Sequence, residues 1–178
     1  MNERIIEREK AYTVVRRCLI TAVLRAAVAA AALGIAFTFL FGIITVERND
    51  MFPQVHAGDM TVFFRPGSFA KQDAVVYDSP DGPAAGRILA CPGDIVDITD
   101  SGQITINGNI MPAQKRLGIY EETEKQEDGI SYPAVLGEDE YFVLGDNRTE
   151  ARDSRVYGCI DKEDIRGVIF LLIRRRMV

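Results

Sequence analysis

The sequence predicts a mainly β protein in which an N-terminal transmembrane helix precedes a two-part β domain. Three observations lead to this fold class. The 178 residues contain one long uncharged apolar run, and it lies near the N-terminus. Short runs rich in β-branched and aromatic residues follow it, separated by Gly, Pro and Asp. No long amphipathic helical pattern occurs after Val46.

The apolar run from residue 26 to residue 46 carries no charge. A helix of about 20 apolar residues crosses a hydrocarbon core of roughly 30 Å, so we expect a transmembrane helix over 26–46. Residues 1–25 carry a net charge of +3, and Glu47 and Asp50 follow the run. This asymmetry predicts a single-pass protein of the cell membrane, with 1–25 in the cytoplasm and 47–178 outside the cell. A cleaved signal peptide is the alternative, but the run is long and a good cleavage site is lacking after it.

The remainder of the chain is predicted to form the β domain. Its net charge is −8, because the whole chain has −5 and residues 1–25 carry +3. An acidic domain argues against nucleic acid as a partner. Turn signals at Asp100-Ser101-Gly102 and Asn107-Gly108 predict hairpins, and they favour an inserted β subdomain over 95–139. The expected strands are Met60–Phe64, Ala74–Tyr77, Ile88–Ala90, Ile95–Thr99, Gln103–Ile106, Tyr141–Leu144 and Val168–Ile173.

Cysteine and histidine are too sparse to predict a metal site or a cofactor. The three cysteines are Cys18, Cys91 and Cys159, and they show no Cys-x-x-Cys spacing. Cys91 and Cys159 either pair or act as two small buried apolar residues. His56 is the only histidine, and a lone histidine without ligands at metal spacing is more often a surface residue.

Three segments carry a resemblance to type I signal peptidases, and the first two are short. Residues 50–59 read Asp-Met-Phe-Pro-Gln-Val-His-Ala-Gly-Asp, where that family has Ser-Met-x-Pro and a later Gly-Asp. Residues 86–94 read Gly-Arg-Ile-Leu-Ala-Cys-Pro-Gly-Asp, where the family has Lys-Arg and a later Pro-Gly-Asp. The matching positions, which the resemblance implies are structural or substrate-facing, are Met51, Pro53, Gly58, Asp59, Arg87, Pro92, Gly93 and Asp94.

A third segment, residues 145–155, resembles the family pattern Gly-Asp-Asn-Arg-x-x-Ser-x-Asp-Ser-Arg. It departs only at Ala151, where the family has Ser. The three segments occur in the family's order after one membrane helix, which makes the resemblance specific. It implies a signal-peptidase-like β domain whose third segment is a structural loop, formed here by Gly145, Asp146, Asn147, Arg148, Asp153, Ser154 and Arg155.

The residues at the family's catalytic positions are different in this chain. The resemblance implies a nucleophilic Ser at position 50, a general-base Lys at 86 and an orienting Ser at 151, but the chain has Asp50, Gly86 and Ala151. A carboxylate is a weak nucleophile toward an amide, and Gly and Ala supply neither a base nor a hydroxyl. Because members of such a unit act together, we expect no catalytic residues and no enzyme activity.

In this interpretation, the residues around Asp50 bind a partner instead of catalysing a reaction. Arg48 and Arg152 are the expected ion-pair partners of Asp50, either to grip a partner or only to hold the loop. The apolar residues Met51, Phe52 and Val76, together with Pro53, are expected to wall a groove that accepts an extended peptide by strand addition.

The functional prediction follows from a second resemblance. Signal-peptidase-like proteins of Gram-positive pilus loci also have Asp and Gly at the positions of Asp50 and Gly86. This similarity implies a chaperone-like factor in sortase-dependent pilus assembly that binds pilin, with sortase and membrane lipid as further partners. Two alternatives remain: an active signal peptidase that uses other residues, for which Ser154 and Lys71 are candidates, and a structural or regulatory membrane subunit.

Overall fold

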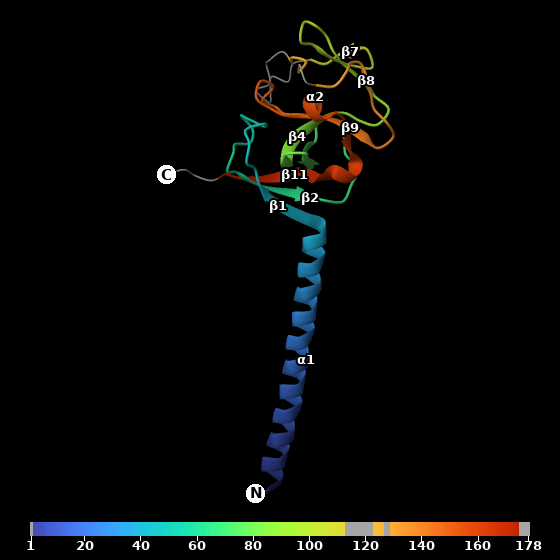
Figure 1. Cartoon of the computed structure of the whole chain (residues 1–178). Coiled ribbons are helices and arrows are strands. Elements are labelled where there is room, and N and C mark those ends of the chain that lie inside the picture. Colours follow the sequence, from blue (N-terminus) through green and yellow to red (C-terminus); the bar gives the residue numbers. More distant parts are fainter. Residues whose placement is uncertain (1, 113–122, 127–128, 175–178) are drawn as a thin grey trace. The chain divides into compact units, whose positions relative to one another are not determined.

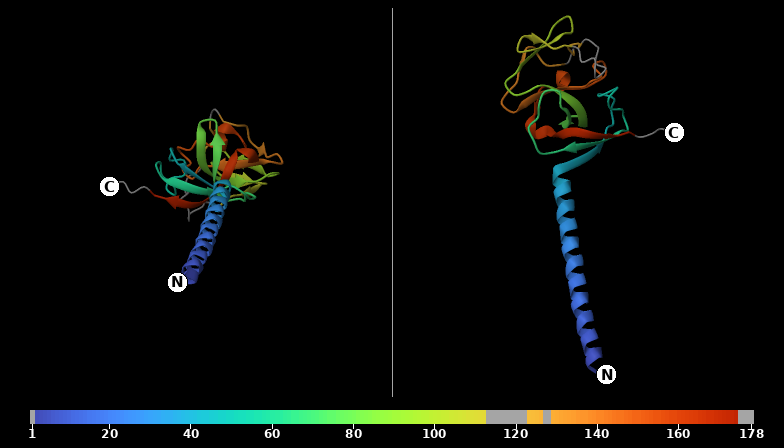
Figure 2. Two further views of the ribbon diagram at one scale, coloured as in Figure 1. Left: turned by 90° about the horizontal axis from the view of Figure 1, so that it is seen from below. Right: turned by 180° about the vertical axis from the view of Figure 1, so that it is seen from behind.

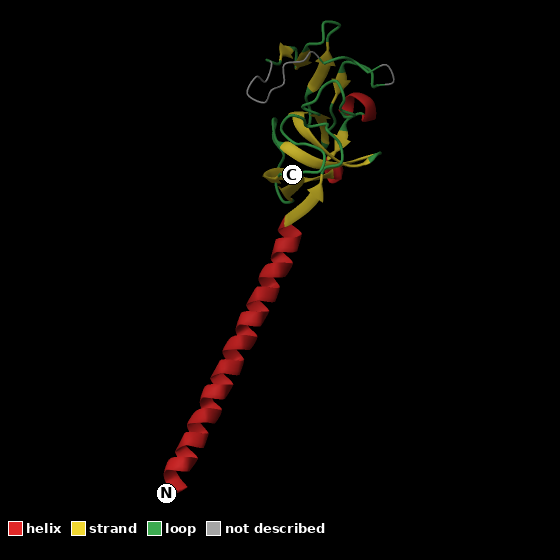
Figure 3. Ribbon diagram, turned by 90° about the vertical axis from the view of Figure 1, so that its left-hand side faces the viewer, coloured by secondary structure: helices red, strands yellow, loops and turns green. Residues whose placement is uncertain are grey.

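A computed structural model describes residues 2–112, 123–126 and 129–174. The chain divides into two compact units, Met1–Leu40 and Phe41–Val178. The first unit is a single helix, whereas the second contains the strands (Figures 1 and 3). The predicted fold class, mainly β with an N-terminal apolar helix, is confirmed.

Helix α1 spans Asn2–Leu40, and Tyr12–Leu40 is long and apolar enough to cross a membrane. Its most apolar stretch has a mean hydropathy of 2.1. Two threonine hydroxyl groups within it bond to the helix backbone, since the Thr21 Oγ1 donates to the Arg17 carbonyl at 2.8 Å and the Thr38 Oγ1 to the Ile35 carbonyl at 2.7 Å. Such internal bonds are what a helix in an apolar medium requires.

The predicted C-terminal end of the transmembrane helix, Val46, is wrong. Helix α1 ends at Leu40, and Phe41–Thr45 forms strand β1. The segment Ile43-Ile44-Thr45 is β-branched, which favours a strand, and β1 pairs antiparallel with Met60–Phe64 from Phe41↔Phe64 to Thr45↔Met60. Hydropathy alone does not separate these apolar strand residues from the helix that precedes them.

The main sheet has seven strands in the order β1-β2-β11-β3-β4-β9-β10, and every neighbouring pair is antiparallel. The last long strand, β11, lies between β2 and β3, which brings the C-terminal part of the chain into the middle of the sheet (Figure 2). The strands are β1, β2 (Met60–Phe64), β3 (Ala74–Ser79), β4 (Gly82–Ala90), β9 (Glu140–Leu144), β10 (Ile160–Asp161) and β11 (Ile165–Ile173).

A second sheet has the order β7-β6-β5-β8, and its strands fall within the range 95–139 that was predicted as an inserted subdomain. The turn at Asn107-Gly108, where both residues have positive φ (51° and 77°), joins β6 to β7 as expected for a two-residue hairpin. The strands are β5 (Ile95–Ile98), β6 (Ile104–Ile106), β7 (Asn109–Ile110) and β8 (Ala134–Val135).

Only short helices follow the first strand in the described residues, namely α2 (Ser154–Tyr157) and the 3₁₀ helix η2 (Lys162–Asp164). Three apolar clusters fill the domain. The smallest of them, formed by Val46, Met51, Val55 and Ala85, joins the first motif segment to strand β4. Burial of these apolar side chains therefore holds residue 50 close to the main sheet.

Strand β11 requires a glycine at the point where it lies closest to β2. Gly167 has φ +154°, and a Cβ at this residue would collide with the Phe64 carbonyl oxygen and lie 2.8 Å from its carbonyl carbon. We expect Gly167→Ala to lower the free energy of unfolding by about 2 kcal/mol or more, measured by urea denaturation of the full chain in detergent. The control is Gly108→Ala, at φ +77° in open space, which is expected to cost only about 1 kcal/mol. Equal losses would contradict the close approach of β11 to β2.

Candidate functional site

The first motif segment is a tight loop whose members face in different directions. Met51 is 1% exposed and packs in the apolar cluster with Val46, Val55 and Ala85, whereas Phe52 is 47% exposed. The Phe52 ring meets the His56 ring edge-on, with centroids 5.1 Å apart. Met51 therefore belongs to the core, whereas Phe52 and Pro53 are exposed apolar residues. The prediction that Met51 and Val76 wall a groove is wrong, because Val76 is fully buried in β3.

Asp50 is the first residue of this loop, and its side chain is buried against the guanidinium of Arg48. Arg48 donates to the same carboxylate oxygen, Asp50 Oδ2, through Nε at 2.8 Å and Nη2 at 2.6 Å. Burial raises the pKa of the Asp50 carboxyl, while the hydrogen bonds and charge of Arg48 act in the opposite direction. The backbone of the same residue is fixed too, because its carbonyl accepts from the Asn147 N–H at 2.9 Å.

The predicted pairing of Asp50 with Arg48 is confirmed, but the predicted pairing with Arg152 is wrong. The Arg152 Nε instead lies 3.6 Å from the Asp81 Oδ2, and its guanidinium is 5.7 Å from the centre of the Tyr157 ring. Only the backbone of Arg152 reaches Asp50, and that hydrogen bond lowers the pKa of the carboxyl. The Arg152 side chain is 60% exposed and turns toward Asp81 and Tyr157 instead.

The other two changed positions lie beside Asp50 near the end of β9. Gly86 pairs with Val75 across β3 and β4, and a Cβ there would lie 2.5 Å from Val143 Cγ1 and 3.0 Å from Tyr77 Cε1. These two side chains therefore fill the space that a longer residue at position 86 would need.

Ala151 is buried next to Gly145. A Cβ at Gly145 would collide with the Ala151 Cβ and would lie 2.5 Å from the Asp50 carbonyl oxygen. A Cβ at Gly86 would also approach the carbonyl oxygen of Leu144, the residue before Gly145, at 3.5 Å. The structure thus brings together all three positions that sequence comparison singled out, as the resemblance implied.

A buried ion pair organises the third motif segment. Arg155, fully buried, donates to the Asp153 Oδ1 through Nε at 2.9 Å and to its Oδ2 through Nη2 at 3.0 Å. Arg155 also donates to the carbonyls of Arg148 (2.8 Å) and Ala151 (3.2 Å). Asp153 caps α2 and accepts from the Gly145 N–H at 2.9 Å. One carboxylate and one guanidinium therefore tie both ends of the loop together.

The remaining matching residues form turns and cross-links. Arg87 binds Asp146 with two hydrogen bonds, 2.9 and 2.6 Å long, which joins β4 to the third segment. Asp94 accepts from the Cys91 N–H at 2.8 Å in the turn that contains Pro92 and Gly93, the latter with φ 82°. Asp59 accepts from the His56 N–H at 3.0 Å, and Gly58 donates to the Val46 carbonyl at 2.7 Å.

Arg148 is the exception among these cations, because it is buried and, within the described ranges, no carboxylate lies at hydrogen-bond distance from it. Its Nη1 donates to the Thr123 Oγ1 at 3.0 Å, and its Nε has no hydrogen-bond partner among the residues that the structure describes. Burial lowers the pKa of Arg148 to about 10.

Neither replacement catalytic residue considered from the sequence lies free beside Asp50. Ser154 is fully buried, and its Oγ accepts from the Val143 N–H at 2.9 Å. The Lys71 Nζ lies 2.8 Å from the Asp94 Oδ2, in the turn of the second segment. The alternative based on these two side chains therefore has no geometric support.

Sequence reasoning missed Asp81, Tyr157 and Tyr77. The motif Pro80-Asp81-Gly82 was visible as a turn signal, but its contact with Tyr157 joins residues 76 positions apart in the chain. Its contact with Arg48 likewise joins separate segments. Tyr77 was read only as a strand residue, although it packs beside Gly86.

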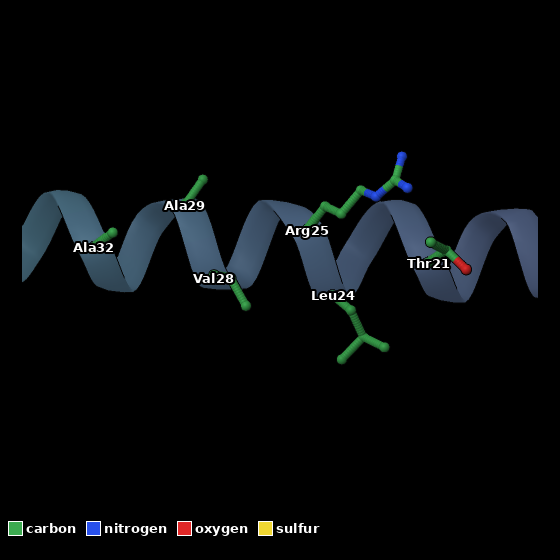
Figure 4. A pocket seen from close by; sticks show the side chains of 6 residues that line it. All are labelled: Thr21, Leu24, Arg25, Val28, Ala29 and Ala32. Carbon is green, nitrogen blue, oxygen red and sulfur yellow. The ribbon is translucent and has the colours of Figure 1, made fainter.

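Two surface hollows lined by described residues lie away from this site. One lies along α1 and is lined by Thr21, Leu24, Arg25, Val28, Ala29 and Ala32, and Figure 4 shows that it is an open gap between side chains of one helix. Another lies by Asp139, Asp161, Lys162 and Glu163. No group of His, Cys, Asp or Glu in the described ranges could hold a metal ion. Cys91 and Cys159 are free thiols that pack against different apolar clusters, so the disulfide alternative is not realised.

The chain belongs to the signal peptidase (peptidase S26) family, whose profile matches residues 19–173. It is similar to signal peptidase I S of Bacillus subtilis, with 32% identity over 141 residues that cover 72% of this chain and 74% of that protein. It is also similar to signal peptidase IB of Staphylococcus aureus, with 25% identity and coverage of 77% and 83%. A solved signal peptidase I from Enterococcus faecalis has a TM-score of 0.47 and 25% identity, over 58% of this chain and 98% of that one.

These comparisons contradict the prediction that the chain is not an enzyme. The relatives that it matches over 74 to 83% of their length are named signal peptidases, at 25 to 32% identity. The resemblance to the signal peptidase family itself is confirmed by the same findings.

The buried ion pair provides a test of how the site is held. Asp153→Asn removes the charge that balances the buried Arg155, and we expect a loss of about 3–5 kcal/mol in the free energy of unfolding, measured by urea denaturation. The control is Asp139→Asn, which removes an exposed contact of 3.9 Å with Lys162 and should change stability by less than about 0.5 kcal/mol. Similar effects of the two substitutions would show that Asp153 is not the anchor of the loop.

Proposed function

We propose that the chain is a membrane-anchored peptidase that cleaves signal-peptide-like segments of exported proteins. Support comes from the family match over residues 19–173 and from relatives named signal peptidases. The apolar helix Tyr12–Leu40 is compatible with an anchor. We place the N-terminus in the cytoplasm and the β domain outside, because the basic residues precede the helix.

The observation that carries this proposal is the buried carboxylate at the first position of the family's motif. Neither Gly86 nor Ala151 supplies a functional group. In place of a Ser at position 50 and a Lys at position 86, the chain offers Asp50 paired with Arg48. Burial raises the pKa of Asp50, and a general base is most effective when its pKa approaches the working pH.

We assign to Asp50 the role of general base. The oxygen of a water molecule bonds to the carbonyl carbon of the scissile peptide while one proton of that water passes to the carboxylate. The proton then passes to the leaving nitrogen as the C–N bond breaks. The Arg48 guanidinium, in contact with Asp50, supplies positive charge for the oxyanion that forms in the first step.

A cleavage assay tests the proposal. The full chain in lipid nanodiscs is mixed with a preprotein peptide that carries an Ala-x-Ala site, and the products are identified by mass spectrometry. We expect cleavage by the wild type, with a rate that rises with pH through the raised pKa of Asp50, because only the ionised carboxylate accepts a proton. Asp50→Asn should lower the rate at least about 100-fold.

The matched control for that assay is Asp78→Asn. Asp78 is a carboxylate of the main sheet that pairs with Arg166 at 2.6 Å, and its removal should leave the rate unchanged. A wild type without cleavage at any pH would refute the peptidase function. Cleavage that survives Asp50→Asn would refute the role of Asp50.

We also propose a second function for the same surface, the binding of pilin in sortase-dependent pilus assembly, with sortase as a neighbouring partner. The combination of Asp50 with Gly86, which the signal-peptidase-like proteins of Gram-positive pilus loci share, favours it. The exposed Phe52 and Pro53 are the apolar residues of the first motif segment that a bound peptide could touch.

Photo-crosslinking tests this second function. A photoreactive amino acid in place of Phe52 should capture a pilin subunit in cells that express both proteins. The control position is Ile110, which is 62% exposed on β7 of the second sheet. Capture from Ile110 as strong as from Phe52, or from neither position, would contradict specific binding of pilin at the first motif segment.

A further inference from the structure

The tip of the β3–β4 hairpin places one carboxylate against three donors from other parts of the chain. Strands β3 and β4 pair as far as Ser79↔Gly82, so Asp81 lies in the two-residue turn between them. The Tyr157 hydroxyl donates to the Asp81 Oδ2 at 2.5 Å. The Arg48 Nη1 and the Arg152 Nε approach the same oxygen at 3.5 and 3.6 Å.

The three donors are held in place by contacts that do not involve Asp81. Arg48 is anchored by Asp50, and its Nη2 donates to the Arg152 carbonyl at 3.3 Å. Tyr157 belongs to α2, and the Arg152 guanidinium lies over its ring. The donors therefore form a preorganised receptor rather than a set of side chains gathered by Asp81.

The charges of this cluster balance only when Asp81 is present. Arg48 and Arg152 carry two positive charges, and Asp50 neutralises one of them. Without Asp81 the cluster retains one unbalanced positive charge beside a hydroxyl donor. Two guanidinium groups and a phenol are well suited to a carboxylate, because they offer charge-assisted hydrogen bonds.

Asp81 itself is free to leave. Its side chain is 43% exposed, and exposed ion pairs contribute little to stability. The hairpin tip does not depend on it, since the Ser79 Oγ donates to the Gly82 carbonyl at 2.8 Å and Asp78 pairs with Arg166 at 2.6 Å. A rotation of the Asp81 side chain alone would open the three donors to a ligand.

We propose that Arg48, Arg152 and Tyr157 form a binding site for the carboxylate of an acidic side chain in a bound peptide, and that Asp81 occupies this site in the free protein. The site adjoins Asp50, so it would bind an Asp or Glu of the peptide next to the place where the peptide contacts the first motif segment. Asp81 then acts as an internal competitor that an acidic peptide must displace. Binding at this site does not depend on the proposed cleavage and can be measured without it.

The test is a peptide titration of the full chain in nanodiscs, followed through the arginine Nε–H signals in NMR. The probes are Ac-Ala-Asp-Ala-NH2 and its uncharged counterpart Ac-Ala-Asn-Ala-NH2. We expect Asp81→Asn to tighten the Kd for the Asp peptide at least fivefold, since the competitor is gone. In that background, Arg152→Gln should weaken the Kd at least fivefold, and added salt should weaken it as well.

The matched control is again Asp78→Asn, because Asp78 lies on the same hairpin with a similarly exposed side chain (44%) but pairs with Arg166 on β11. It should leave the Kd unchanged. The proposal is overturned if Asp81→Asn leaves the Kd of the Asp peptide unchanged, or if the Asn peptide binds equally well. Thermal unfolding of each variant identifies any loss of fold, and cleavage of the preprotein peptide is scored separately, so the two proposals fail independently.

Discussion

The buried ion pair between Asp153 and Arg155 is the contact on which the geometry of the site depends. Its carboxylate caps α2 and accepts the Gly145 N–H, while its guanidinium binds the carbonyls of Arg148 and Ala151. Two charges without access to water are costly unless every hydrogen-bonding position is filled, and here nearly all are. The loop between β9 and α2 consequently has one arrangement that satisfies this pair.

That arrangement determines where the chemically important positions lie. Because the Asp153 carboxylate holds Gly145, the Asp50 carbonyl can approach the backbone there, and Asn147 donates to the same carbonyl. Arg87 joins Asp146 to β4 and thereby brings the strand of Gly86 to the same loop. The geometry of the scaffold can thus be separated from the identity of the groups at its centre, and the chemistry must be argued from those groups.

Charge is arranged around Asp50 in two layers with different physical character. The inner contact with Arg48 is partly shielded from water, and it competes with burial in determining the pKa of the carboxyl. The outer contacts, from Asp81 to Tyr157, Arg48 and Arg152, are exposed and readily exchanged for those of a ligand. A stable inner pair beside a labile outer cluster is an arrangement suited to recognition of a peptide.

The sequence by itself determined the fold class, most strands, the family, and the three positions 50, 86 and 151, because strand periodicity, turn residues and motif spacing are local properties of the chain. It also named Arg48, two residues away, as one of two expected partners of Asp50. Only the tertiary structure decided that α1 ends at Leu40, that Met51 and Val76 are buried, and that Arg152 turns to Asp81. These outcomes depend on pairing and packing between segments distant in the chain, which no local pattern encodes.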